Sequence, residues 1–328
     1  MRRLGSQTGG RRESKRRVDG GGGERGGGGM ITTPTVLILG AGSSLMYGFP
    51  SGARLRKQIL QRLSSGGSEM RRTYESMGFN KHAVQVFHDA LLKSGTESVD
   101  ALLEHRTDLL TIGKTAIAEA LIPCENEAAL FNAKRDWYGY LADRLDAPFD
   151  RFNENRLTVV TFNYDRSLEW YLFNSLGARF SKKHAEVIRQ LSNIPIIHLY
   201  GTLGGVPWDS HSRQYDPTLN PKSIRLARDA IKIIHEGERN EEEFDRALNA
   251  LRTAKRIIFL GFGYNRTNIS RLEPKEWKNC GQPIGTAVER TEMENQEAGR
   301  LIGHGITFGD PNWDILTFLR EMITLDRP

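Results

Sequence analysis

The sequence has little cysteine and no long apolar run, and both absences exclude classes of protein. Its 328 residues include two cysteines, Cys124 and Cys280, and no Cys-x-x-Cys pair. A disulfide framework and a four-cysteine zinc module are therefore excluded, and we expect no metal site. No apolar run approaches the roughly 18 residues that cross a bilayer, and the N-terminus lacks the apolar segment of a secretory signal. We accordingly expect a soluble, cytoplasmic protein without a membrane partner.

Acidic residues are fewer than basic ones, but the imbalance is local. The chain has 46 Lys and Arg against 40 Asp and Glu, a formal net charge of +6. Residues 1–30 hold eight basic and three acidic residues, a net +5, so the remaining 298 residues carry only +1. The basic excess therefore gives little reason to expect a nucleic-acid partner for the folded body.

The N-terminal segment at residues 1–29 is predicted to be a disordered, basic, glycine-rich tail. Eleven of the 34 glycines lie there and large apolar side chains are almost absent, so folding could not offset the loss of chain entropy. Two interpretations stay open. The tail is a flexible basic arm, or it is translated leader and Met30 is the true start, since Gly, Glu and Arg codons can be purine-rich like a ribosome-binding site.

Beyond Met30, short apolar runs alternate with helical periodicity. Strands are predicted at 35–39, 157–162, 194–199, 256–260, 283–288 and 305–308. Helices are predicted at 166–176, 182–191, 223–235, 241–254, 292–302 and 313–323. The alternation predicts an α/β fold over residues 30–328, with a Rossmann-like, mostly parallel sheet and helices on both faces. Residues 66–150 contain no predicted strand, and we expect a helical insertion there.

A glycine-rich turn follows the first predicted strand, with the sequence Gly40-Ala41-Gly42-Ser43-Ser44. Glycines at a strand-to-helix turn let backbone N–H groups approach a phosphate, and a helix N-terminus favours an anion. The turn departs from the dehydrogenase fingerprint, because Leu45 stands where the third glycine belongs and no acid-ended strand follows about 20 residues on. Strand geometry alone is the alternative reason for these glycines.

Three further strand ends carry polar residues or glycines. Asn163 and Asp165 follow the second strand, and Asp165 is a candidate N-cap for a helix beginning near Arg166. Gly261 and Gly263 follow the fourth strand. Because ligands of open α/β sheets bind at the carboxyl ends of strands, these residues and the glycine turn predict a dinucleotide-sized cleft.

The third predicted strand ends in His198, Leu199, Tyr200 and Gly201. Period-2 alternation places His198 and Tyr200 on one face. A histidine inside a strand is more often a satisfied core residue than a catalytic one. A catalytic histidine, in contrast, would titrate near neutrality and accept a proton.

Taken together, these motifs resemble the sirtuin-like (silent-information-regulator-like) NAD-binding family, in its bacterial branch associated with antiphage defence. The resemblance spans about residues 35–320, and no single motif carries it alone. The residues that carry it are Gly40-Ala41-Gly42-Ser43-Ser44, Gly48-Phe49-Pro50-Ser51-Gly52, Ser98-Val99-Asp100-Ala101-Leu102-Leu103, Thr161-Phe162-Asn163-Tyr164-Asp165, Ile197-His198-Leu199-Tyr200-Gly201 and Leu260-Gly261-Phe262-Gly263.

The resemblance implies binding of NAD and its hydrolysis to nicotinamide and ADP-ribose, with no metal cofactor. It implies catalytic roles for Asn163, which would hold the attacking water, and for His198 or Tyr200 at the ribose. It further implies a set of NAD-binding residues: Gly40, Ala41, Gly42, Ser43, Ser44, Asp165, Gly201, Gly261 and Gly263. Lysine deacylation is disfavoured, because the sirtuin deacylases carry a zinc module that this chain cannot build.

The sequence departs from the family at one position. The usual catalytic histidine sits immediately before the glycine, where this chain has Tyr200, and His198 lies roughly 6–7 Å deeper along the strand. Either His198 serves from there, or Tyr200 bonds a ribose hydroxyl while water is activated otherwise, or NAD is bound without turnover. The chain would then be an NAD or ADP-ribose sensor that signals to a partner protein. An ADP-ribosyl transferase is a third hypothesis, and a homo-oligomer or a defence-system partner is possible.

Overall fold

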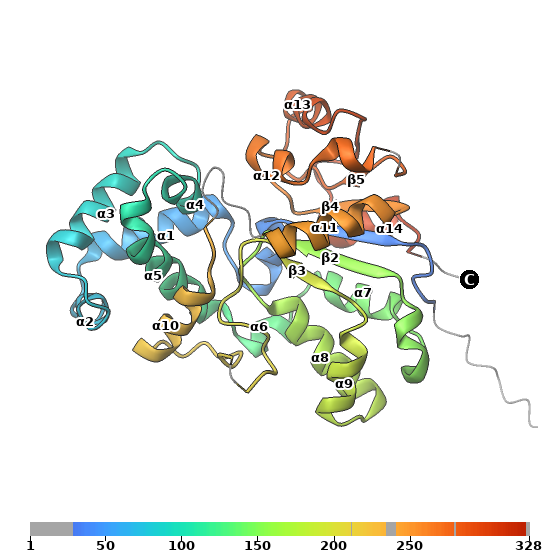
Figure 1. The fold of residues 1–328 in the computed structure, drawn as a ribbon, viewed down its shortest axis with the longest axis horizontal. Helices are drawn as coiled ribbons and strands as arrows, with labels where there is room; N and C mark the ends of the chain where they lie inside the picture. Colours follow the sequence, from blue (N-terminus) through green and yellow to red (C-terminus); the bar gives the residue numbers. More distant parts are fainter. Residues whose placement is uncertain (1–28, 211, 234–240, 279, 326–328) are drawn as a thin grey trace, which may run out of the picture.

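The computed structural model describes residues 29–210, 212–233, 241–278 and 280–325 (Figure 1). Nearly all of the tail predicted at residues 1–29 therefore lies outside the described residues, and its disorder stays a prediction. Within the described ranges, no helix combines the length and the apolar character needed to cross a membrane.

Six parallel strands form one sheet in the order β3-β2-β1-β4-β5-β6. The strands are β1 (Thr35–Leu39), β2 (Leu157–Thr161), β3 (Ile196–His198), β4 (Arg256–Leu260), β5 (Ile284–Gly285) and β6 (Thr307–Phe308). All six predicted strands are confirmed, although β2 is one residue shorter than predicted and β3, β5 and β6 are also shorter. This strand order is that of a Rossmann-type fold, and the predicted α/β class is correct.

The central strands are buried because helices cover both faces of the sheet. Every residue of β1 is buried, as its uninterrupted apolar run requires. On one face, α8 (Ser167–Phe180) packs on α9 (His184–Leu191) and on α7 (Trp137–Arg144), which also contacts α14 (Ile315–Met322). After β3 the chain crosses back, so α11 (Glu241–Thr253), α12 (Arg266–Arg271) and α13 (Glu292–Ile302) follow on the other side. Figure 1 shows α8 and α9 below the strands, and α12 and α13 above them.

A group of helices lies beside the sheet, between β1 and β2 in the chain (Figure 1). Its members are α1 (Gly52–Ser65), α2 (Ser68–Ser76), α3 (Lys81–Lys93), α4 (Val99–Leu103) and α5 (Leu110–Leu121), whereas α6 (Glu127–Phe131) contacts α8. Helices α1, α3 and α5 contact one another, and α10 (Pro221–Ala230) packs on α5. That residues 66–150 are an insertion stays a proposal, and α7, inside that range, packs on the sheet layer instead.

Several element boundaries differ from the predictions. The helix predicted at 223–235 ends at Ala230 because Ile231 leaves it to form an antiparallel bridge with Gly201; residues 234 and 235 lie outside the described residues. Helix α12 was not predicted, since its six residues show no apolar repeat. Short 3-10 helices occupy Ala41–Tyr47, Thr107–Leu109, Ile122–Cys124, Phe149–Glu154 and Pro274–Trp277.

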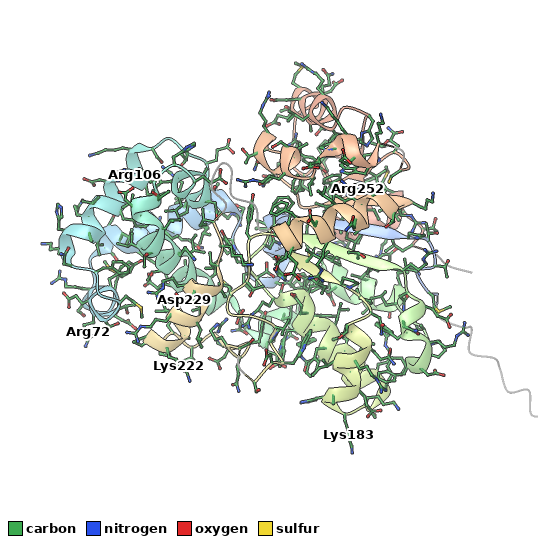
Figure 2. The ribbon with its side chains drawn as sticks, viewed as in Figure 1. Arg72, Arg106, Lys183, Lys222, Asp229 and Arg252 are labelled. Atoms are coloured by element: carbon green, nitrogen blue, oxygen red, sulfur yellow. The ribbon has the colours of Figure 1, made fainter. Side chains whose placement is uncertain are left out.

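Charged side chains are spread over the periphery of the molecule. Figure 2 shows Arg72, Lys183 and Lys222 projecting outward from three different helices or loops, and all three are exposed. The basic residues of the folded body are thus distributed over separate elements.

Candidate functional site

The strand order reverses between β1 and β4, and two glycine turns meet at this point. The turn after β1 and the turn after β4 are joined by backbone hydrogen bonds: Gly40 N donates to Leu260 O (3.1 Å) and Gly42 N to Gly261 O (2.9 Å). In open α/β sheets, the carboxyl ends of the strands at such a reversal border the ligand-binding crevice. The structure therefore brings together Gly40, Gly42 and Gly261, which belong to two separate sequence motifs.

Contact between the two turns explains most of these glycines. A Cβ atom at Gly40 would lie 2.6 Å from Gly261 O, and one at Gly261, whose φ is +57°, would lie 2.1 Å from Ser43 N. A side chain at either position would thus collide with backbone. Gly263 differs, because a Cβ there meets nothing within 4 Å. The close contact between the two turns is therefore sufficient reason for the glycines that the sequence connects with a phosphate. Gly263 has no such contact and is open to a ligand.

A buried polar network ties the first glycine turn to the end of β2. The Asn163 side-chain amide donates from Nδ2 to Gly40 O (3.0 Å) and to Ser43 Oγ (3.1 Å). Ser44 Oγ donates to Asp165 Oδ2 at 2.8 Å. Ser43 and Ser44 are fully buried, so their side chains hold the turn in place. Burial raises the pKa of Asp165, against the hydrogen bonds from Ser167 and Ser44.

Asp165 is not the N-cap residue that the sequence predicts. Helix α8 begins at Ser167, and Arg166 occupies the N-cap position. Asp165 still acts at the helix start, because its Oδ1 accepts a hydrogen bond from Ser167 N at 3.2 Å. The prediction was off by one residue, while the bond to a free N–H of the first turn is the one expected of a cap.

Asn163 retains one unused polar atom. Its backbone N donates to Thr161 Oγ1 (3.0 Å) and its Nδ2 is shared among the turn acceptors. Its Oδ1 accepts no hydrogen bond from the described residues, nor is it one of their fully buried atoms that lack a partner. Asn163 as a whole is only 8% exposed, and its Oδ1 is an amide oxygen without a partner among the described residues, at the edge of the predicted cleft.

His198 is held by two acceptors on the α8 side of the sheet. Its Nδ1 donates to Asn163 O at 2.9 Å, and its Nε2 contacts Glu169 Oε1. Burial lowers the pKa of His198, but the Glu169 carboxylate, the hydrogen bond to Asn163 O and the Asp165 charge together outweigh burial and raise this pKa above its usual value. Both ring nitrogens are occupied, so the imidazole has no free nitrogen to accept a proton from substrate. The catalytic role stays a prediction that these contacts do not favour.

Tyr200 faces away from His198, contrary to the single face that alternation predicts. Strand β3 ends at His198, so the two-residue period does not continue to Tyr200. The Tyr200 hydroxyl donates to Asn268 Oδ1 (2.7 Å) and accepts a hydrogen bond from Arg271 Nη1, both on α12. Burial raises the pKa of Tyr200 well above its usual value, so this hydroxyl stays protonated. Tyr200 is therefore bound to the face of the sheet opposite α8.

Gly201 serves a turn rather than a strand. Its φ is +70°, and a Cβ there would lie 2.1 Å from Ala230 O at the end of α10. The glycine lets the chain after β3 pass close to α10, which packs on the helical group. Its predicted part in binding NAD stays a prediction.

Carboxylates that were given no site role from the sequence lie near the same sheet edge, although Asp100 belongs to one of the motifs that carry the resemblance. Asp100 accepts a hydrogen bond from the Tyr164 hydroxyl, and burial raises the pKa of Asp100. Glu104, one turn further along, accepts a hydrogen bond from Arg271 Nη1 at 3.1 Å. These contacts link the helical group to the ends of β2 and β3. Glu169 is the acidic residue in the first turn of α8, a position where carboxylates are favoured.

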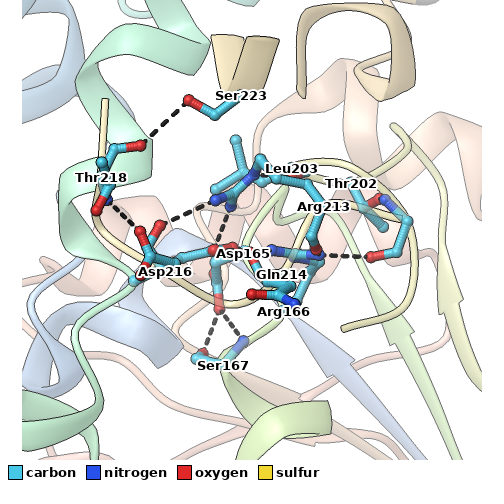
Figure 3. Close-up of polar contacts among 12 residues, drawn as sticks. Asp165, Arg166, Ser167, Thr202, Leu203, Arg213, Gln214, Asp216, Thr218 and Ser223 are labelled. Atoms are coloured by element: carbon cyan, nitrogen blue, oxygen red, sulfur yellow. Dashed lines mark hydrogen bonds and ion pairs between the residues drawn. The ribbon is translucent and has the colours of Figure 1, made fainter. Parts of the chain in front are cut away.

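Three buried charges fix the loop that follows Gly201. Glu125 and Arg166 are fully buried, and Arg213 is nearly so. Arg166 donates from Nε and Nη2 to the Glu125 carboxylate (3.0 and 2.7 Å), and Arg213 Nη2 donates to the same group. Arg166 also donates to Arg213 O (2.6 Å) and Gln214 O (3.1 Å). Figure 3 shows Arg166 and Arg213 converging beside Asp165, so the loop lies against the strand end that carries Asn163.

A hollow also lies between helices α1 and α5. A hollow of about 450 Å³ is lined by residues of α1, α5 and the following turn, including Gly48, Arg62 and Cys124. Burial raises the pKa of the Cys124 thiol to about 11, so it is protonated at neutral pH. In the described part of the chain, no three His, Cys, Asp or Glu side chains are grouped as metal ligands.

The comparison with known families adds a relationship for the central part of the chain. Residues 157–273 match the family model of the SIR2-like domain. This range begins with β2 and includes Asn163, β3, the loop fixed by Glu125, and β4. No curated protein matches the chain. The match includes the strand end that carries Asn163. It supports a sirtuin-like relationship for residues 157–273 and suggests a function related to NAD.

Proposed function

We propose that this protein binds NAD in a crevice beside the two joined glycine turns, and hydrolyses it to nicotinamide and ADP-ribose. The observation that carries the proposal is the placement of Asn163. Its amide is fixed to Gly40 O at 3.0 Å, at the point where the strand order reverses, while its Oδ1 remains available. The match to the SIR2-like domain supports NAD as the dinucleotide.

The reaction suits an amide better than a titrating group. The bond between C1′ of the ribose and the pyridinium nitrogen breaks with its electron pair on nitrogen, so nicotinamide leaves as a neutral molecule. No general acid is needed for that step. A water oxygen then forms the new bond to C1′ and releases its proton to solvent. Asn163 Oδ1 would orient this water or a ribose hydroxyl, which is a positioning contribution.

The residues around the crevice fit a dinucleotide in two respects. Gly263 is exposed and has open space beside it, which lets a ligand approach the backbone closely. Ala41 and Gly42 are partly exposed above the buried serines, so the turn presents backbone to the crevice. Ser43, Ser44 and Asp165 are buried and would support the turn that contacts the pyrophosphate.

Release of nicotinamide by purified protein tests the proposal. We expect Asn163→Ala to lower the turnover of NAD by about 100-fold or more, because the water loses its orienting group. Asn249→Ala, which removes an exposed amide on α11, is the matched control and should leave turnover unchanged. Equal turnover in the Asn163 variant and the wild type would overturn the assignment.

A sensor of NAD or ADP-ribose is the second candidate, favoured by one observation. Both nitrogens of His198 and the Tyr200 hydroxyl are already bound within the protein, which leaves neither of them free as a base. If wild-type protein binds NAD in a calorimeter but releases no nicotinamide, the sensor function holds.

The proposed setting is bacterial antiviral defence, as the sequence resemblance implies. Expression of the wild-type chain in a bacterial host should reduce phage yield, and Asn163→Ala should not. Equal phage yields with the two proteins would argue against this setting without bearing on the chemistry.

A further inference from the structure

The contacts of His198 are unusual for a catalytic base, because both of its neighbours accept hydrogen bonds. Asn163 O is a backbone carbonyl and can only accept, so His198 Nδ1 carries a hydrogen. Glu169 Oε1 faces Nε2 in a buried ion pair, in which the side chains of His198 and Glu169 are 9% and 6% exposed. One proton therefore lies between Nε2 and Oε1, and a second joins Nδ1 to Asn163.

The backbone carbonyl that accepts the hydrogen bond from His198 belongs to Asn163, the residue proposed to orient the attacking water. Asn163 is fixed at its side chain by Gly40 and at its backbone N by Thr161. His198 supplies the remaining anchor, at the backbone carbonyl. Thr161 and His198 are also direct partners in the β2–β3 ladder, so the imidazole reaches Asn163 from a rigid strand.

We infer that His198 and Glu169 act together as positioning residues, with protonated His198 fixing the backbone of Asn163 so that its Oδ1 points to the reacting ribose. This inference rests on the proposed function and assigns His198 a role other than proton acceptance from substrate. Glu169 keeps the imidazole protonated and aligned, and neither residue touches the substrate.

Loss of the shared proton would release Asn163. A neutral imidazole carries one hydrogen and cannot donate to both acceptors. The bond to the ionised Glu169 is charge-assisted and the stronger of the two, so the hydrogen would move to Nε2 and the bond to Asn163 O would be lost. The charged groups that face the ring are Glu169 on α8 and Asp165 in the turn before α8. The buried Tyr215 hydroxyl lies near both and has no partner among the described residues.

The two possible roles of His198 give opposite dependence on pH. A general base must be neutral, so turnover would rise as His198 loses its proton. A positioning cation must be charged, so turnover would be constant at low pH and fall as the pH rises through the pKa of His198. Whether turnover rises or falls as His198 loses its proton therefore distinguishes a positioning cation from a general base.

The experiment compares pH profiles of NAD turnover in wild type, Glu169→Gln and His198→Gln. We expect an alkaline fall in wild type and its displacement to lower pH, by about one unit or more, in Glu169→Gln, because the neutral amide no longer supports the imidazolium. In His198→Gln the alkaline fall should vanish, with a lower kcat and little change in KM. Glu297→Gln, an exposed glutamate on α13, should keep the wild-type profile.

A spectroscopic readout keeps the inference separate from the proposed function. The imidazole of His198, assigned by its absence in His198→Gln, and the side-chain amide of Asn163 are followed by NMR during a pH titration of the full chain. We expect the Asn163 amide signals to shift with the titration of His198, and at lower pH in Glu169→Gln. The inference would be overturned if the Asn163 amide signals did not change as His198 titrates, or if turnover rose as His198 lost its proton. If the Asn163 amide signals followed the titration of His198 but no nicotinamide were released, only the proposed hydrolase activity would be overturned.

Discussion

At the scale of single residues, a glycine-rich turn can reflect either phosphate binding or close packing against another part of the backbone. The Gly40 to Ser44 turn suggested phosphate binding, and the structure shows that Gly40 and Gly42 are packed on the backbone of Gly261. A contact between residues 221 positions apart leaves no local signal, so the sequence could locate the turns but not their mutual contact. The structure thus separates the glycines needed for folding from Gly263, which is open.

The two kinds of glycine should respond differently to a methyl group. Gly261→Ala combines a positive φ with a collision against Ser43 N, and we expect it to lower the free energy of unfolding by about 2 kcal/mol or more. Gly263→Ala has open space and should be nearly neutral for stability, while weakening the affinity for NAD. Urea denaturation and calorimetry measure the two effects. Equal stability losses at the two positions would contradict the assignment.

His198 and Tyr200, at the end of β3, show where sequence periodicity fails to predict the direction of a side chain. Alternation placed His198 and Tyr200 together, yet His198 bonds to Glu169 on α8 and Tyr200 to Asn268 on α12. The period of a strand holds only while the strand lasts, and β3 stops at His198. Strand ends, where ligands bind, are therefore where sequence periodicity is least informative about side-chain direction.

At the scale of elements, the loop after β3 depends on buried charge. Arg166, directly after the Asn163 to Asp165 motif, contacts Glu125 and the backbone of residues 205, 213 and 214. Three ionisable groups without exposure are stable only as a complete set, since an unpaired buried charge is strongly unfavourable. Their sequence separation, from 125 to 213, again explains why no motif revealed them.

Removing the single negative charge of this set should destabilise the protein. Glu125→Gln leaves Arg166 and Arg213 without a counter-ion, and we expect the free energy of unfolding to fall by about 3–5 kcal/mol. Glu154→Gln breaks the exposed pair with Arg151 and should have no measurable effect. Denaturant unfolding followed by circular dichroism compares the variants, and a stable Glu125→Gln would show that the loop is held by other contacts.

The strands themselves were the most predictable elements. The central strands are mainly apolar because both faces of the sheet are covered, and the boundaries of β1 and β4 agree with the prediction to the residue. Helix α12 was missed because its six residues, Arg266–Arg271, are too few to show a repeat. Tertiary contacts, not local pattern, thus decide the small helix that carries Asn268 and Arg271.

At the scale of the whole molecule, the strand order places the candidate site. Each half of the sheet contributes one glycine turn at the reversal between β1 and β4, so a ligand bound beside both turns would contact both halves. The sequence predicted the parallel sheet and the convergence of its motifs. It could not predict which side chains were already engaged with one another, since that depends on how the halves meet.

A ligand that joins both halves should stabilise the entire fold. We expect NAD to raise the melting temperature of Asn163→Ala, in which turnover does not deplete the ligand, with a gain of about 2.7 kcal/mol when NAD reaches 100 times its Kd. Adenine alone, which cannot contact both turns, should give a smaller shift. Differential scanning calorimetry measures both, and a melting temperature independent of NAD would exclude binding in the crevice.

The open space at Gly263 also makes it a place for a chemical reporter. Burial raises the pKa of both native thiols, Cys124 to about 11, and both are only partly accessible, so neither competes well for a maleimide at neutral pH. A cysteine introduced at position 263 would therefore carry a fluorophore at the mouth of the crevice. Occupancy of the site could then be followed by light emission in living cells, without waiting for a reaction product.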